Sequence, residues 1–324
     1  MSEPQNEYVA DAAPRELITG VSDHPGHRLA SYFVWPALLL GAVFFTSLGM
    51  QTDYPLLSFY GVYVVFALTI GGIERLLPHE RTWLQDDHQS GANIAHTLLN
   101  KGALPMLAVI GVIFGLAETE QAADVVADGI WPSEWPMVAQ VALAMVGAEF
   151  GLYWAHRTAH EIQFVWRFHA VHHSVTRLWF LNTGRFHLVD SFWSVLFSQP
   201  ILFLMGAPAD VILMFGAITA FIGMLTHCNI ECRTGVLDYV FNTPQMHRWH
   251  HSKDLREGNT NYGENLMLWD QLFGTYFNEP RRPPADIGIQ TFMPPTFVGQ
   301  MIHPFHKEQG VADPMMSATR EEAS

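Results

Sequence analysis

The stretch "MVAQVALAMVGAEFGLYWAHRTAH", residues 137–160, runs from an apolar segment directly into a pair of histidines. Its first part, Met137–Tyr153, is a candidate for a membrane helix, which needs about 20 apolar residues to cross the hydrocarbon core. His156 and His160 follow at a spacing of four, which places two side chains on one face of a helix. The stretch therefore predicts a membrane helix with two imidazoles just beyond its end.

Apolar segments of this kind recur along the chain. Apolar residues make up 49% of the 324 residues and charged residues only 15%, and the mean hydropathy is positive. The further segments are Tyr32–Met50, Pro55–Ile73, Leu104–Ala117, Phe192–Met205 and Pro208–Leu225. We predict an all-α integral membrane protein with a four-helix transmembrane bundle of two hairpins, residues 32–73 and 104–153. The last two segments would form an extra hairpin that spans or re-enters the membrane, and a histidine-rich cap would cover the cytoplasmic side.

The basic residues sort to one side of this arrangement. With the N-terminus inside, the outside loops are residues 51–54, 118–136 and 206–207, and none of the 17 Lys and Arg residues falls in them. Because Lys and Arg accumulate in cytoplasmic loops, we predict a protein of the bacterial inner membrane with both termini and every histidine motif in the cytoplasm. The net charge of −14 argues against a nucleic-acid partner, which needs a basic face.

Three parts follow from these segments. Residues 1–30 form a polar tail without the basic start and apolar core of a signal peptide. Residues 31–280 form the membrane domain, and residues 281–324 form a C-terminal tail. The two cysteines, Cys228 and Cys232, are too few for a disulfide framework, and we interpret them as packing residues rather than as metal ligands.

The motif His-x-x-His-His occurs twice, in "FHAVHHS" at residues 168–174 and in "MHRWHHS" at residues 246–252. Residues three and four apart share one face of a helix, so each motif can aim three imidazoles at one point. Without a metal, such rings would repel one another when protonated and would lack donors when neutral. Neutral imidazole is a good ligand for iron, zinc, copper and nickel, so the motifs indicate a metal site.

The clustered histidines are too many for one ion and suit two ions of about four or five ligands each. The predicted ligands are His156, His160, His169, His172, His173, His227, His247, His250 and His251. The chain contains no His-Glu-x-x-His motif, which argues against a zinc protease. Redox chemistry at such a site needs iron or copper.

Two divalent ions on neutral ligands would leave a charge of about +4, which carboxylates bonded to the outer imidazole nitrogens would balance. The candidates for these outer partners are Glu149, Glu161, Asp190, Glu231, Glu264 and Asp270, with Asn265 as a neutral hydrogen-bonding partner. His96, in "ANIAHTLLN", has no partner motif, and we expect it to pack in the interior without binding metal.

The order of these motifs along a membrane scaffold resembles the fatty acid hydroxylase/sterol desaturase superfamily. The ending "NYGENLMLWDQLFGTYF", residues 261–277, is also similar to the ending of that family, and the resemblance covers about residues 60–280. It implies a membrane-bound non-haem enzyme with two iron ions. Such an enzyme uses O2 and electrons to hydroxylate or desaturate a C–H bond of a lipid, such as a sterol or a fatty acyl chain. Because we find no fused electron-transfer domain, we expect a separate donor, a ferredoxin or a cytochrome b5 with its reductase.

The stretch "RFHLVDSF", residues 185–192, resembles the His-Pro segment of the sterol-acting branch of this family, but Leu188 stands where proline is usual. His187 is therefore either a further metal ligand or a hydrogen-bond donor to one.

Two other classes of membrane protein also use histidines. A metal transporter carries ionisable residues within its spans along a pathway, whereas these motifs lie beyond the helix ends on one side. A cytochrome with bis-histidine haem needs paired histidines on facing spans, which the closely spaced motifs fit poorly. A lipid oxidase remains the preferred hypothesis, with a histidine-rich metal transporter or metal-binding protein as the alternative.

Overall fold

The computed structural model describes residues 25–103 and 129–306. Within these ranges the protein is helical, and its β structure is limited to isolated bridges such as Pro78 to Ile230. The helices that are long and apolar enough to cross a membrane are α1 (Pro25–Gly49), α2 (Pro55–Leu76), α6 (Met137–Glu161), α8 (Leu188–Met205) and α9 (Ala209–His227). The expected helical membrane architecture is therefore confirmed at this level.

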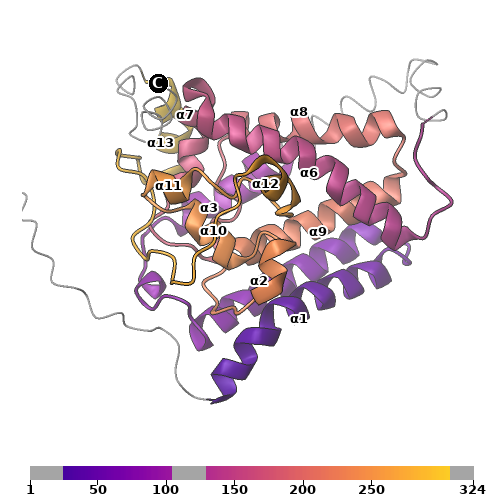
Figure 1. Cartoon of the computed structure of the whole chain (residues 1–324), viewed down its shortest axis with the longest axis horizontal. Helices are drawn as coiled ribbons and strands as arrows, with labels where there is room; N and C mark the ends of the chain where they lie inside the picture. Colours follow the sequence, from indigo (N-terminus) through magenta and orange to yellow (C-terminus); the bar gives the residue numbers. More distant parts are fainter. Residues whose placement is uncertain (1–24, 104–128, 307–324) are drawn as a thin grey trace, which may run out of the picture.

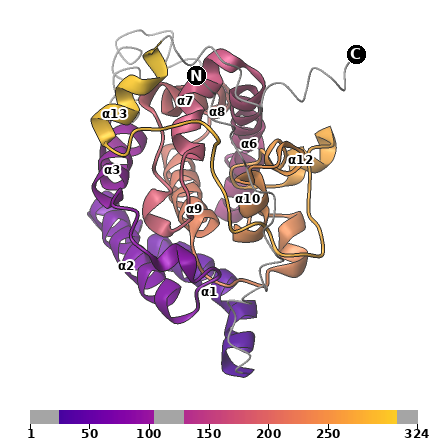
Figure 2. The same cartoon turned by 90° about the vertical axis from the view of Figure 1, so that its left-hand side faces the viewer.

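The long helices lie side by side, and α9 runs between α2 and α6 in both views (Figures 1 and 2). The segments that we expected to span or re-enter the membrane are the separate helices α8 and α9, joined at Gly206, whose φ of 77° suits glycine. The expected segment Leu104–Ala117 lies outside the described residues. The two-hairpin bundle of four transmembrane helices therefore stays a prediction.

Helices α6 and α8 pack closely, because Gly151 brings the two backbones together. A Cβ atom at this position would lie 2.1 Å from the carbonyl oxygen of Phe197 on α8, so no larger residue fits without a shift. This contact fixes α8 against the part of α6 that leads into His156 and His160.

Shorter helices gather at one end of the long ones (Figure 1). They are α3 (Ser90–Ala95), α7 (Gln163–His173), α10 (Pro244–His250), α11 (Leu255–Gly258), α12 (Leu268–Phe273) and α13 (Phe297–Ile302). A π-helix, η2 (His96–Ala103), continues α3, and the 3-10 turns are η1 (Thr82–Leu84), η3 (Phe180–Asn182), η4 (Gly235–Tyr239) and η5 (His303–Phe305).

The apolar core lies between the long helices, and it includes Trp35, Phe66, Ala144 and Leu225. The outer faces of α1 and α2 are apolar as well; Leu40 and Leu57, for example, are 68% and 71% exposed. Large exposed apolar surfaces mark contact with a membrane or with a partner. Together with the length of the helices, these faces suit contact with lipid.

Candidate metal centre

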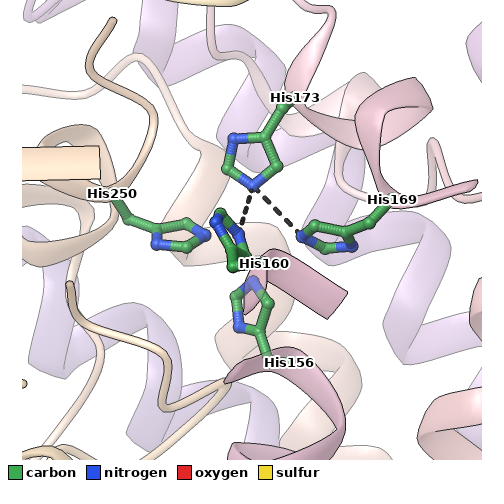
Figure 3. A group of neighbouring side chains, drawn as sticks. All are labelled: His156, His160, His169, His173 and His250. Carbon is green, nitrogen blue, oxygen red and sulfur yellow. Dashed lines mark hydrogen bonds between the residues drawn. The ribbon is translucent and has the colours of Figure 1, made fainter. Parts of the chain in front are cut away.

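The structure brings all nine predicted ligand histidines together in two buried groups. The first group is His156, His160, His169, His173 and His250, and the second is His172, His227, His247 and His251. Within each group the ligand nitrogens all lie within 4.8 Å of one another. The rings of the first group point toward one another from three helices (Figure 3).

Each His-x-x-His-His motif is divided between the two groups. Helix α7 gives His169 and His173 to the first group and His172 to the second. The motif at α10 does the reverse, with His250 in the first group and the other two in the second. The expectation that each motif aims three rings at one point is wrong. Residues four apart share a face, but the ring between them points in another direction, because consecutive helical residues differ by about 100°.

The outer nitrogens of several rings have fixed partners that accept hydrogen bonds. Backbone carbonyls and side-chain oxygens of Asp and Asn hold these Nδ1 atoms, so each Nδ1 carries the proton and each Nε2 keeps a lone pair. The pairs are His156 with the Tyr262 carbonyl at 2.7 Å, His250 with the Thr260 carbonyl at 2.7 Å, His169 with Asp190 at 2.8 Å, His160 with Asn259 at 3.2 Å and His227 with Asn182 at 2.9 Å.

The inner Nε2 atoms then face one another, and none of them carries a proton that it could donate in a hydrogen bond. In the first group, Nε2 of His173 lies 3.1 Å from Nε2 of both His160 and His169. Nε2 of His156 and Nε2 of His250 are buried and have no hydrogen-bond partner within residues 25–103 and 129–306. Converging lone pairs in a buried site need a cation between them, and nitrogen donors suit iron, zinc or copper. The donor set therefore fits a metal ion.

The second group shows the same convergence. Nε2 of His247 lies 2.8 Å from Nε2 of His227 and 3.1 Å from Nε2 of His251. Nε2 of His251 in turn lies 3.2 Å from Nε2 of His172. Burial lowers the pKa of His172, His247 and His251 well below the usual range, and neighbouring imidazoles lower it further. The same holds for His173 and His250 in the first group. These rings are therefore neutral, which is the form that binds metal.

Among the predicted outer partners, Asp190 directly contacts a clustered histidine. The residue lies in the first turn of α8 and is 2% exposed, and its carboxylate accepts a hydrogen bond from Nδ1 of His169. Asp270 acts one step away, because it accepts hydrogen bonds of 2.7 Å from the backbone N–H groups of Tyr262 and Gly263. These bonds fix the turn whose carbonyl at Tyr262 holds His156.

The structure does not bring Glu231 or Glu161 to either group. Glu231 lies 2.7 Å from Nδ1 of His79, and Glu161 pairs with Arg157 at the surface. Both acids lie close in sequence to clustered histidines, but neither position faces the site.

His187 also lies outside both groups, because both of its ring nitrogens have other partners. Nδ1 accepts from the backbone N–H of Val189 at the start of α8, and Nε2 lies 3.1 Å from the Met301 carbonyl. His96 is fully buried, with its nitrogens 2.9 Å from the Phe186 carbonyl and 2.8 Å from Gln300, as expected for a packing residue.

A cavity of about 820 Å³ adjoins both groups. Four histidines line it, namely His156, His172, His227 and His247. Its other walls come mainly from α2, η2 and α9 and are largely apolar, and its volume is typical of sites for small molecules. On α9, Gly216, Ala220 and Gly223 lead away from His227 along one face, over a rise of about 16 Å.

Comparison with known proteins gives a consistent result. The sequence model of the family described as fatty acid hydroxylase matches residues 141–275, which include all nine histidines. The chain is 49% identical over 284 residues to the ornithine lipid hydroxylase OlsE of Rhizobium tropici, over 87% of this chain and 86% of that protein.

More distant relatives match smaller parts of the chain. The chain is 32% identical over 147 residues to alkylglycerol monooxygenase of Homo sapiens, over 45% of this chain and 32% of that protein. It is 29% identical over 194 residues to a probable Delta(7)-sterol 5(6)-desaturase of Neurospora crassa, over 57% of this chain and 51% of that protein. No solved structure matches.

Proposed function

Because the chain belongs to the fatty acid hydroxylase family, we propose that it is a membrane-bound di-iron enzyme that hydroxylates a lipid with O2. The observation that carries this proposal is the pair of buried histidine groups beside a largely apolar cavity. The first group would hold one iron and the second group the other. When bound, the irons supply the activation of O2 that the oxidation of an unactivated C–H bond requires.

The residues of the chain would prepare this chemistry. The carbonyls of Tyr262 and Thr260 and the carboxylate of Asp190 keep a proton on the outer nitrogens, so that the inner nitrogens stay free for metal. The apolar walls of the cavity exclude water and hold the lipid chain along α9. Overall, one oxygen atom of O2 enters the lipid and the other leaves as water, with two electrons and two protons consumed.

Ornithine lipid is the substrate that we propose first, because the relative with nearly full coverage is an ornithine lipid hydroxylase. We further propose that a separate protein of the ferredoxin or cytochrome b5 type supplies the electrons.

Lipid mass spectrometry tests the reaction. Cells that contain ornithine lipid and express the chain should accumulate a species with one additional oxygen atom, and cells expressing an inactive variant should not. Loss of two hydrogens would instead indicate desaturation. If neither change occurs in any lipid class, although purified protein carries two irons and receives electrons from a working donor, the proposed function is wrong.

We also propose that the metal centre faces the cytoplasm. In this arrangement Asp53, in the exposed turn between α1 and α2, lies outside, whereas Val236, 79% exposed near the histidine end, lies inside. A membrane-impermeant thiol reagent should label Asp53→Cys in intact cells and Val236→Cys only after permeabilisation. The native cysteines are buried, so they give little background. The reverse labelling pattern would contradict the proposed orientation.

Filling the cavity should block the lipid without removing the metal. A Cβ atom at Gly216 has no neighbour within 4 Å, and this position lines the cavity. Gly216→Leu would extend a side chain into the space for the lipid, and we expect kcat/KM to fall by at least about 10-fold because the lipid is displaced. Iron content should not change, as metal analysis would show.

Gly61→Leu is the matched control. Gly61 also has open space around it, but it lies on α2 and does not line the cavity. If both variants kept full activity, the cavity would not be the lipid site.

A further inference from the structure

Two residues that line the cavity carry buried amide oxygens without a hydrogen-bond partner among the described residues. They are Oδ1 of Asn242 and Oδ1 of Asn265, and both residues are 1% exposed and line the cavity. Buried polar atoms are nearly always hydrogen-bonded, so each such exception requires an explanation. Two unpartnered acceptors in one cavity point to a ligand that donates hydrogen bonds.

The hydrogen-bond partners of each side-chain amide indicate which end is the nitrogen and which is the oxygen. In Asn265 the backbone N–H and Nδ2 each donate to the Glu149 carboxylate at 2.8 Å. In Asn242 the Nδ2 atom donates to the Gly263 carbonyl at 2.6 Å. Reversing the Asn242 amide would bring its oxygen onto the Gly263 carbonyl oxygen. Reversing the Asn265 amide would bring its oxygen onto the carboxylate of Glu149, which in its ionised form has no proton to donate. The nitrogen ends are therefore bound within the protein, and the oxygen ends are left for a ligand.

These amides lie beside the second histidine group. Nδ2 of Asn242 is 3.5 Å from Nδ1 of His247, and its backbone N–H donates to the Asn265 carbonyl at 2.8 Å. A group bound to these oxygens would therefore lie at the histidine end of the cavity, away from Gly216.

A carboxylate lines the same cavity next to them. Glu264 precedes Asn265, and its contacts are long: 3.4 Å from the Ser194 hydroxyl and 3.9 Å from Nζ of Lys101. Lys101 lies over the ring of Phe186, with Nζ 4.1 Å from the ring centroid. Among the described residues, the cationic partner of this carboxylate is Lys101 at the long distance of 3.9 Å, so the carboxylate can accept a further hydrogen bond from a ligand.

We propose that Asn242, Asn265 and Glu264 form a binding site for a protonated amine of the lipid substrate. An ammonium group carries three N–H donors, and the site offers two neutral acceptors and one anionic acceptor. A neutral hydroxyl or amide would satisfy fewer of these groups and would gain nothing from the charge of Glu264. This inference rests on the proposed function and adds to it that the amine-bearing end of the lipid lies against the histidines.

The test uses the full-length, iron-loaded protein with a reductant and two probes. One probe is an ornithine lipid with its free amine, and the other is the same lipid acetylated on that amine. For wild-type protein, kcat/KM should be at least about 10-fold higher with the free-amine lipid than with the acetylated lipid. This difference corresponds to the loss of the interaction between the ammonium group and its site. Glu264→Gln should raise KM for the free amine by about 10-fold, leave KM for the acetylated lipid nearly unchanged, and keep its iron.

The control is Glu161→Gln, which alters a surface acid outside the cavity and should behave as wild type. Asn265→Ala is less suitable, because it removes one of the donors to buried Glu149 and risks misfolding. Fragmentation of the product should place the new oxygen on the amine-bearing fragment. Equal use of both lipids, or a new oxygen within the acyl chain, would overturn the amine site and leave the proposed function intact. Absence of any oxidised lipid would instead contradict the proposed function itself.

Discussion

His172→Ala should lose iron from the second group and lower turnover by about a thousandfold or more. His172 supplies Nε2 to that group, 3.2 Å from Nε2 of His251, and its ring also lines the cavity. Alanine leaves a vacant ligand position that water can fill but cannot hold as firmly. Residues that act as one catalytic unit typically lose most of the rate when any member is removed. Metal analysis and lipid turnover should be measured on the same preparation.

Two further variants make this prediction decisive. His250→Ala should have an effect of similar size, because it removes a ligand from the first group. His96→Ala should keep both irons, because that ring bonds only to Phe186, Gln300 and Asn100 in the described interior. Should His96→Ala lose iron while the other two retain it and turn over normally, the histidine groups would not be the metal centre.

Asp190→Asn should keep some iron but lower metal affinity or activity by about 10- to 100-fold. The carboxylate of Asp190 accepts the Nδ1 proton of His169 at 2.8 Å in a buried position, which orients the ring and makes its inner nitrogen a better donor to metal. Asparagine has nearly the same shape but no charge, and its nitrogen cannot accept. Metal titration of the reconstituted protein measures the affinity, and the lipid assay measures the rate.

Glu231→Gln is the matched comparison, because Glu231 is also a buried acid bonded to a histidine. That histidine is His79, which lies in neither group. We therefore expect wild-type iron content and activity within about twofold from this variant. Equal losses in both variants would mean that the contact between Asp190 and His169 has no special role.

The sequence identified the nine histidines that the structure brings together, because spacings of three and four residues suit side chains that share one face of a helix. It did not predict how each triplet divides. That depends on the angle at which α7 and α10 approach each other, which is set by packing between segments far apart in the chain. The sequence identified Asp190 as one candidate partner of a histidine, but only the fold shows that Asp190 contacts a clustered histidine and that Glu231 and Glu161 do not.

Other parts of the site have little signal in the sequence. The carbonyls of Thr260 and Tyr262 hold two of the rings, and any residue type supplies a carbonyl. Asn182, Asn242 and Asn259 are ordinary polar residues until the fold brings them to the histidines. The cavity is also a property of several helices together, although the small residues at positions 216, 220 and 223 are spaced to line one face of α9.

Because the histidine motifs at α7 and α10 each contribute to both groups, metal binding has a consequence for the conformational entropy of the chain. Each bound ion would join segments that are distant in sequence, such as the one with His156 and the one with His250, and so would act as a cross-link that closes a long loop. Closing such a loop removes conformational freedom mainly from the unfolded chain, and the effect grows only slowly with loop length. The binding free energy of the ions is therefore also folding free energy for the histidine-bearing end of the molecule. Removal of metal should loosen this end while the long helices, held by their own packing, keep their helical structure.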